Sequence, residues 1–177
     1  MTERLVLRLL SIDDFDDVWD YMRLPEVGRH MVWLSRDREQ SRAALARLTT
    51  ETGLEKDGDY LTLAATVDGT VVGHVKLGLV SAEHQQGEIG YVFHPDHHGK
   101  GIATEGVREM LRLGFDEVNL HRIIGRCSAR NTASVRLMTR LGMRQEARFV
   151  DCRKVGGEWR EELVFAMLDR EWSGQQR

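Results

Sequence analysis

The 177-residue sequence has only two cysteines and no long apolar run. Cys127 and Cys152 form neither a Cys-x-x-Cys pair nor a metal-binding spacing, so we expect free thiols in a reducing compartment. No segment approaches the roughly 18 consecutive apolar residues that a membrane-spanning helix needs. The opening apolar stretch is interrupted by Arg8 and followed by acidic residues, unlike a secretory signal. These absences predict a cytoplasmic protein with no membrane partner.

Neither sign of charge dominates, because 25 lysines and arginines stand against 28 acidic residues, a formal net charge of -3. Basic residues are interleaved with acids and form no run that would bind phosphates along a backbone, so nucleic acid is not an expected partner. So small a charge does not select a substrate. Repeats, low-complexity tracts and linkers are also missing, and 41% hydrophobic residues can build a core. Residues 1–177 are predicted to form a single domain.

The hydrophobic pattern predicts an ordered series of strands and helices. Strands are expected over residues 3–10, 60–67, 71–80, 87–94, 122–128, 143–155 and 159–169. Helices are expected over 12–22, from about 36 to the Lys-Asp-Gly-Asp stretch at 56–59, over 102–117 and over 131–142. Ser11 and Asp14 form a capping pair for the first helix, which Pro25 ends. This order predicts an α/β protein with a mixed sheet and helices on both faces.

One segment, "GEIGYVFHPDHHGKGIATEGVREML" at residues 87–111, passes from an apolar strand through a short loop into an amphipathic helix. The loop lies at the start of the helix, where backbone N–H groups lack intrahelical partners. Those groups and the helix dipole favour an anion, and Gly99 and Gly101 let it approach the backbone closely. The loop is therefore predicted to hold a phosphate or pyrophosphate; the alternative is a loop that only turns the chain.

Three glycine motifs can be compared with this loop. A single residue separates Gly99 from Gly101, so the loop is not the GxxxxGK[ST] motif, and it does not continue as GxGxxG. The pattern His98-x-x-Gly101-x-Ala103 resembles the acyl-CoA pyrophosphate loop of the GNAT superfamily of N-acyltransferases, where Gln or Arg usually stands at the position of His98. The resemblance implies contacts to acyl-CoA from the residues of the loop and helix start, His98, Gly99, Lys100, Gly101, Ile102, Ala103 and Thr104.

A second motif lies in "NTASVRLMTRLGM", residues 131–143. Its N-x-x-S-x-x-L-x-x-x-L-G-M pattern, with the later Glu171-Trp172 pair, resembles the Rim-type branch of GNAT enzymes, the ribosomal-protein-alanine N-acetyltransferases. The resemblance implies that Asn131 reaches the pantetheine arm and that Ser134 lies close to the thioester sulfur. Asn131 is equally suited to cap the helix that begins here.

The resemblance covers essentially the whole chain and implies a fold and an activity. The implied GNAT fold is a mixed, largely antiparallel sheet of about seven strands, flanked by about four helices and splayed between strands four and five. The implied activity is transfer of an acetyl or other short acyl group from acyl-CoA directly to a primary amine of a peptide N-terminus or small molecule, in a ternary complex. A homodimer is a family-level expectation. Because fold does not fix function, a non-catalytic acyl-CoA-binding sensor or assembly module is the alternative.

Acyl transfer from a thioester to an amine needs a base, an oxyanion donor and a donor for the departing thiolate. Glu88, just ahead of the loop, is the candidate base, at a position often acidic in relatives; a surface glutamate is the alternative. The resemblance implies main-chain contacts from Val92 and Phe93, with a backbone N–H near Phe93 facing the oxyanion. Ser134 is the candidate donor to the thiolate. Its alternative is a helix serine bonded to a carbonyl one turn back.

Three further residues are candidates for binding. Arg140 follows Ser134 by six residues and is expected near the 3'-phosphate end of CoA, with a solvated helix arginine as the alternative. Met31 and Trp33 lie in the non-helical stretch between the first two helices and are candidates for the amine pocket, because an aromatic side chain there can form a pocket wall.

Metal and covalent chemistry are not expected. His94, His97 and His98 lack the closed ligand set of a structural zinc site, and neither cysteine accompanies them. Cys127 lies in an apolar strand, where thiols are generally inert. The prediction is therefore a site that holds acyl-CoA as co-substrate and no metal.

Overall fold

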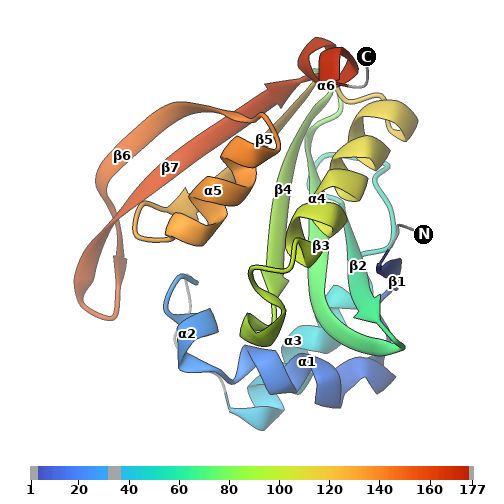
Figure 1. Ribbon diagram of the computed structural model, residues 1–177, viewed down its shortest axis with the longest axis vertical. Helices are drawn as coiled ribbons and strands as arrows, with labels where there is room; N and C mark the ends of the chain where they lie inside the picture. The colour runs from blue at the N-terminus through green and yellow to red at the C-terminus, as the bar shows by residue number, and fades with distance from the viewer. Residues whose placement is uncertain (1–3, 32–36, 176–177) are drawn as a thin grey trace.

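Seven strands hydrogen-bond in the order β1-β2-β3-β4-β5-β7-β6 in the computed structural model, which describes residues 4–31 and 37–175 (Figure 1). The strands are β1 (Val6–Leu9), β2 (Tyr60–Val67), β3 (Thr70–Ser81), β4 (Gln86–Phe93), β5 (Arg122–Ser128), β6 (Arg144–Val155) and β7 (Glu158–Leu168). The helices are α1 (Phe15–Met22), α2 (Pro25–Gly28), α3 (Arg38–Leu48), α4 (Ile102–Arg112), α5 (Thr132–Arg140) and α6 (Asp169–Gln175). Neighbouring strands are antiparallel except β4 and β5, which are parallel. The predicted mixed, largely antiparallel sheet is confirmed.

The helix starts follow from local capping. Ser11 and Asp14 form the expected capping box, but around a short 3-10 turn over Ile12–Asp14 from which α1 continues. α1 ends at Met22, and Pro25 does not end it but opens the short helix α2, because a proline in the first turn lacks only an N–H that would be unpaired there anyway. The predicted second helix is α3, which Asp37 caps and which ends at Leu48, well before the expected end at 56–59.

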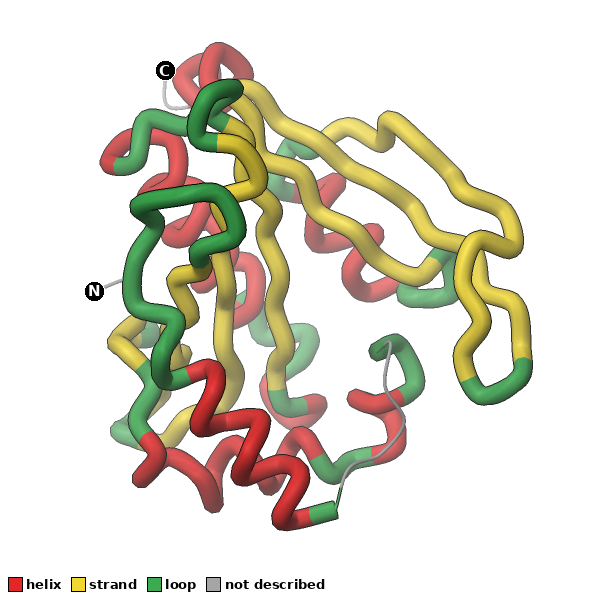
Figure 2. Tube along the Cα trace, turned by 180° about the vertical axis from the view of Figure 1, so that it is seen from behind, coloured by secondary structure: helices red, strands yellow, loops and turns green. Residues whose placement is uncertain are grey.

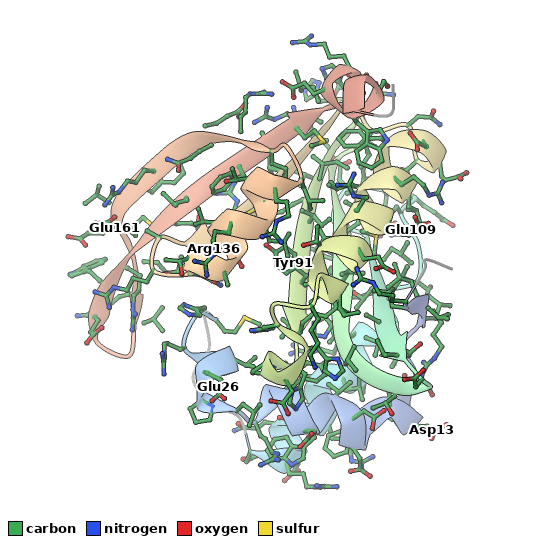
Figure 3. All side chains as sticks on the ribbon, in the orientation of Figure 1. Asp13, Glu26, Tyr91, Glu109, Arg136 and Glu161 are labelled. Carbon is green, nitrogen blue, oxygen red and sulfur yellow. The ribbon has the colours of Figure 1, made fainter. Side chains whose placement is uncertain are left out.

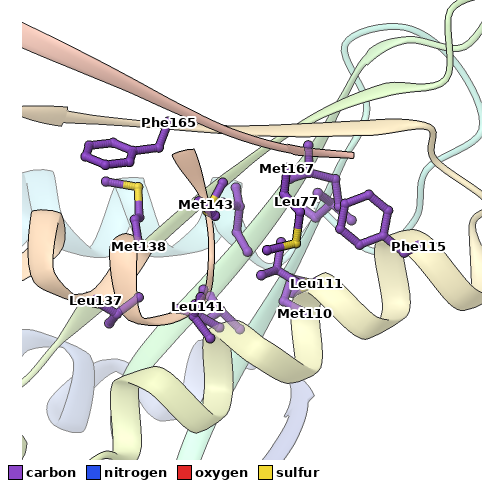
Figure 4. Close-up of a cluster of buried hydrophobic side chains, with 14 of the residues drawn as sticks. Leu77, Met110, Leu111, Phe115, Leu137, Met138, Leu141, Met143, Phe165 and Met167 are labelled. Carbon is purple, nitrogen blue, oxygen red and sulfur yellow. The ribbon is translucent and has the colours of Figure 1, made fainter. Parts of the chain in front are cut away.

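Helices cover both faces of the sheet and bury two apolar clusters. On one face α4 and α5 pack side chains such as Met110, Leu111 and Met138 against β3–β5 and β7 (Figure 4). Each such side chain stabilises the fold by about 2 kcal/mol relative to an exposed one. On the other face α1 and α3 form a smaller cluster that includes Tyr21. None of the helices in the described residues is long and apolar enough to cross a membrane.

The predicted helix over 102–117 and the carboxyl-terminal stretch depart from expectation in detail. The α-helix ends at Arg112, and residues Leu113–Glu117 form a π-helical turn. Helix α6, which was not predicted, is held against this turn by Trp172, whose Nε1 donates to Asp116 Oδ1 at 3.0 Å and whose ring stacks on Phe115. The Glu171-Trp172 motif therefore lies in helix α6, which Trp172 anchors to the rest of the fold.

The sheet opens between its two parallel strands. Residues Gln86–Ile89 of β4 pair with Arg122–Gly125 of β5, and beyond this point the two strands separate. β4 continues unpaired on this edge to Phe93, while β5 stays paired with β7 as far as Ser128. The half of the sheet with β5–β7 leans away from the half with β1–β4 in both views (Figures 1 and 2). The predicted splay between strands four and five is confirmed.

Candidate functional site

A cleft of about 580 Å³ lies where β4 and β5 separate, a volume within the range of small-molecule sites. The end of β4, the loop into α4 and the first turn of α4 line one side of it. The end of β5 and helix α5 line the other side, and α2 with the residues up to Met31 closes one end. Figure 3 shows Tyr91 on the β4 side and Arg136 on the α5 side of this gap.

The unpaired edge of β4 offers backbone groups to the cleft. His94 donates its N–H to the carbonyl of Val72 on β3 at 2.8 Å, so His94 faces β3. Because successive residues of a strand direct their N–H groups to opposite edges, the N–H groups of Phe93 and Tyr91 face away from β3, toward the cleft. The Phe93 ring is buried in the α4 cluster. Phe93 can therefore serve the cleft through its main chain.

The loop before α4 depends on two glycines in left-handed conformation. Gly99 has a φ of +73° and Gly101 a φ of +81°, values that residues other than glycine rarely adopt. Gly101 is also the N-cap of α4, and among the described residues no side chain caps this helix. The first-turn N–H groups are therefore left for an acceptor in the cleft, and the positive end of the helix dipole favours an anion there.

Arg4 fastens this loop from the outside. Its guanidinium donates to the carbonyl of Lys100 at 2.7 Å through Nη1 and to Glu105 Oε2 at 2.8 Å through Nε. The backbone N–H of Arg4 donates to the other oxygen of Glu105 at 2.9 Å. Glu105 lies in the first turn of α4, so the clamp fixes the helix start and the loop together. Sequence reasoning missed Arg4, because it lies 101 residues from Glu105.

His98 closes the loop on the strand. Its Nε2 lies 3.1 Å from the carbonyl oxygen of Phe93, and because a carbonyl can only accept, Nε2 carries the hydrogen. The His98 side chain therefore ties the loop to the end of β4, although Gln or Arg usually stands at this position in the family motif. Most residues predicted to contact acyl-CoA line the cleft, namely Val92, Phe93, His98, Gly99, Gly101, Ala103, Thr104, Asn131, Ser134 and Arg140. Lys100 and Ile102 do not line the cleft. The carbonyl of Lys100 accepts a hydrogen bond from Arg4, and Ile102 is buried in the core.

Helix α5 presents polar groups from its first turn and positive charge along its length. Asn131 caps the helix, since its Oδ1 accepts from the N–H of Ser134 at 3.1 Å, which leaves the Nδ2 amide for the cleft. The Ser134 hydroxyl makes no bond to the carbonyl one turn back among the described residues. Arg136 and Arg140, one helical turn apart, both line the cleft. Arg136 was missed, although its spacing from Arg140 could have indicated it.

Tyr91 is a third residue that the sequence reasoning missed. Its ring packs against the α4 cluster and its side chain lines the cleft beside Cys127 and Ser134. Burial raises the pKa of Tyr91 to about 12, an effect that the nearby Ser134 side chain opposes. Tyr91 Oη is buried and has no hydrogen-bond partner among the described residues.

Glu88 lies at the edge of the cleft rather than in its lining. Its side chain shares a strand face with Gly90 and Val92, opposite to Tyr91, and its Oε2 lies 3.3 Å from Nε of Arg126. Arg126 does line the cleft and also lies 3.3 Å from Glu162 on β7. Arg126 thus holds the Glu88 carboxylate beside the point where β4 and β5 separate, and it contacts Glu162 as well. That Glu88 is the base stays a prediction.

The α2 end of the cleft is lined by Met31, a candidate for the amine pocket, together with Arg29 and His30. Burial lowers the pKa of His30, and the charges of Arg29 and Arg160 act in the same direction. A smaller hollow of about 50 Å³ extends from here toward β6 and β7. Trp33, the other predicted pocket residue, lies outside the described residues.

The cysteine and histidines near the cleft show no sign of covalent or metal chemistry. Burial, with the Glu162 charge, raises the pKa of the Cys127 thiol to about 11, so the thiol is protonated and a poor nucleophile at neutral pH. His94 Nε2 lies 3.3 Å from Asp20 Oδ2 on α1. Within 4–31 and 37–175, no three His, Cys, Asp or Glu side chains are grouped to hold a metal ion.

The donor set fits an acyl-CoA. An uncapped, glycine-bounded helix start suits its pyrophosphate, an open strand edge suits its amide-bearing arm, and arginines suit its further phosphate. A parallel strand pair that opens beside such a helix start defines an acyl-CoA-dependent acyltransferase. The comparisons with known proteins agree with this class. The family profile described as the acetyltransferase (GNAT) domain matches residues 4–144, and the chain belongs to this family.

Individual relatives cover nearly the whole chain. YnaD, an uncharacterized N-acetyltransferase of Bacillus subtilis, is 31% identical over 172 residues, which are 97% of this chain and 98% of YnaD. A GNAT-family acetyltransferase structure from Bacillus anthracis superimposes with a TM-score of 0.86 at 30% identity, covering 96% of this chain and 98% of that one. A spermidine N-acetyltransferase from Vibrio cholerae, solved with CoA and spermine, has a TM-score of 0.82 at 18% identity, covering 96% and 98%, and shares the fold. The chain is thus a GNAT N-acetyltransferase, as the sequence resemblance to RimJ/RimL-like members predicted.

Proposed function

We propose that the protein transfers an acetyl or other short acyl group from acyl-CoA directly to a primary amine of a peptide N-terminus or small molecule, within a ternary complex. The observation that carries this proposal is one cleft that contains the open β4 edge, the uncapped start of α4 and the polar face of α5. Direct transfer is supported by the thiol of Cys127, which burial keeps protonated and unsuited to form an acyl-enzyme.

On the donor side, the first-turn N–H groups of α4 would hold the pyrophosphate. The Nδ2 of Asn131 is left to donate to the pantetheine arm, and Arg136 and Arg140 would face the 3'-phosphate. The N–H of Phe93 would stabilise the oxygen of the thioester as charge develops on it. Ser134 would donate to the departing sulfur. Each role uses a group that the described fold leaves free on the cleft side.

On the acceptor side, Glu88 would accept the amine proton through a water, since its carboxylate lies at the cleft edge and is tied to Arg126 at 3.3 Å. Met31 would contact the acceptor. Glu26 and Arg29 both line the α2 end of the cleft, and Arg126 is paired with Glu88 and Glu162, so positive and negative charges are balanced there. The acceptor is therefore left as a primary amine of a peptide N-terminus or small molecule.

Calorimetric titration with CoA and acetyl-CoA, followed by thiol-release assays with a panel of amines, tests the proposal. The panel should contain peptides with free N-termini, amino acids, polyamines and aminoglycosides. Binding together with turnover of at least one amine is the expected result. Binding without turnover of any amine would indicate a non-catalytic acyl-CoA-binding module, and no binding would refute both functions.

A further inference from the structure

A single buried polar atom of the described side chains lacks a hydrogen-bond partner, and it is the hydroxyl oxygen of Tyr91. Buried hydroxyls are normally paired, because an unpaired one loses its hydrogen bond to water and gains nothing in return. Phenylalanine would fill the same space without this cost. The hydroxyl is therefore best explained by a partner that it finds only when the site is at work.

The position of Tyr91 indicates where that partner lies. Tyr91 is two residues beyond Ile89, the last β4 residue paired with β5, so it stands at the point where the sheet opens. Its hydroxyl lies near Ser134 on α5 and Cys127 on β5, since both side chains act on the pKa of Tyr91, and all three residues line the cleft. Of these neighbours, Ser134 has a hydroxyl that can accept a hydrogen bond and donate another.

Tyr91 is not suited to give up its proton. Burial raises its pKa to about 12, whereas an ordinary thiol has a pKa near 8.5. Proton transfer from Tyr91 to a thiolate would leave a buried tyrosinate and would run uphill. A neutral tyrosine hydroxyl can still donate a hydrogen bond, which fixes the direction of its partner.

We propose that Tyr91 Oη donates a hydrogen bond to Ser134 Oγ when acyl-CoA occupies the cleft, and so aims the serine hydrogen at the sulfur. This inference rests on the proposed function. In the transfer, the N–C bond forms as the C–S bond breaks, the electron pair of that bond stays on sulfur, and the amine proton goes to Glu88 through water. Tyr91 and Ser134 keep their protons, and the thiolate takes its own from water after release. Tyr91 is thus a positioning residue that acts through Ser134.

The test compares the binding of CoA and desulfo-CoA, which lacks the thiol, to the parent and to Tyr91→Phe, Ser134→Ala and the double variant. The parent should prefer CoA, more so at about pH 9, where more of the thiol is ionised. Each single variant should lower this preference about threefold to tenfold, and the double variant should lower it no further than Ser134→Ala. In acetyl transfer, Tyr91→Phe should lower kcat by a similar factor and leave KM for acetyl-CoA nearly unchanged.

Control measurements separate this role from a structural one. Tyr91→Phe should be at least as stable to heat as the parent, because it removes an unpaired buried hydroxyl. Tyr60→Phe, which removes the hydroxyl of an exposed tyrosine on β2, should change neither preference nor kcat. A parent that does not bind CoA would refute the proposed function. If the parent binds CoA and transfers the acyl group, two results would overturn the inference without touching the proposed function. One is a CoA preference that Tyr91→Phe leaves unchanged. The other is a loss of CoA preference on Tyr91→Phe that is as large in the Ser134→Ala background as in the parent.

Discussion

Arg126 on β5 joins Glu88 on β4 to Glu162 on β7, with its guanidinium nitrogens 3.3 Å from an oxygen of each carboxylate. The three strands lie side by side in the sheet, so one cation connects carboxylates from both halves of the splayed structure. The Glu88 side chain is partly exposed, which leaves room for a water between its carboxylate and an amine in the cleft. This geometry suits a base that works at a distance.

Glu88→Gln should lower kcat for amine acetylation about 100-fold, because it removes proton acceptance while keeping the size of the side chain. CoA affinity should not change, since Glu88 does not line the cleft. Steady-state kinetics and calorimetry measure the two effects. Glu162→Gln is the matched variant on the other carboxylate, and Glu83→Gln, on an exposed turn, is the neutral control. A larger loss in Glu162→Gln than in Glu88→Gln would assign the base to β7.

Gly101→Glu should abolish measurable CoA binding, because it sets a negative charge and a side chain at the helix start that we assign to the pyrophosphate. Gly101→Ala should weaken binding less, through strain of about 1–2 kcal/mol at a φ of +81° and crowding against Arg4 Nη2 at 3.0 Å. Gly157, at the β6–β7 turn, has a φ of +87° and open space around it. The same two substitutions there should cost similar stability and leave CoA titrations unchanged. If substitutions at Gly101 and Gly157 change CoA binding equally, the loop before α4 only turns the chain and does not bind the pyrophosphate.

Arg136→Gln and Arg140→Gln should each weaken binding of CoA about fivefold to tenfold and leave binding of 3'-dephospho-CoA nearly unchanged, because each removes one cation from the phosphate. The loss should shrink as salt is added. Arg130→Gln, which removes a surface arginine paired with Glu158 outside the cleft, is the matched control. If both ligands weaken equally, these arginines bind another part of CoA or none of it.

Gly90→Leu should raise KM for the amine by about tenfold or more while leaving CoA affinity and thermal stability close to those of the parent. Gly90 lines the cleft on the strand face of Glu88, its φ lies outside the left-handed region, and a Cβ added there meets nothing within 4 Å. Gly53→Leu, at another open position, is the control for an added surface side chain. If Gly90→Leu instead abolishes CoA binding, the pantetheine arm of CoA lies on the Gly90 face of β4.

The stability of the fold should fall between about pH 7 and about pH 5 because of His74. Its Nδ1 lies 2.8 Å from Tyr21 Oη, within hydrogen-bond distance, and burial lowers the pKa of His74 to about 4, below the unfolded value near 6.5. The unfolded state therefore binds more protons in this range, so the contribution is complete above about pH 6.5 and is lost as pH falls, by about 2 kcal/mol at pH 5.

Chemical denaturation at the two pH values checks this expectation. His74→Gln should show a smaller difference between them, while His84→Gln, at an exposed turn, should keep the parent difference. If His74→Gln and the parent lose the same stability, another group is responsible for the acid sensitivity.

Much of the fold could be predicted because its signals are local. Alternating apolar residues gave the strands, and Asn131 and Ser11 were recognisable caps. The parallel pairing of β4 and β5, and their separation, came from the resemblance, because no local pattern specifies which strands neighbour each other. Pro25 was expected to end the first helix but begins α2 instead. A proline can do either, because it is excluded from a helix interior but accepted in the first turn.

The parts of the site that escaped prediction depend on distant residues. Arg4 and Glu105 are ordinary charged residues until folding brings them together. Tyr91 appears in sequence as one more apolar strand residue, and only its buried, unpaired hydroxyl marks it. Arg126 contacts two acids at once, and these lie 38 and 36 residues away in the sequence. Pairings of this kind are set by packing and register.

The opening between β4 and β5 also bears on how the protein behaves in concentrated solution. Unpaired strand edges normally lie at the rim of a sheet, where short strands and charges keep other chains from adding to them. Here such an edge lies in the middle of the sheet, at residues 90–93, and it is covered by a small molecule if the proposed binding mode holds. An empty cleft would then leave a template for self-association, so purification and storage with CoA should keep the protein monodisperse at concentrations where the empty form aggregates.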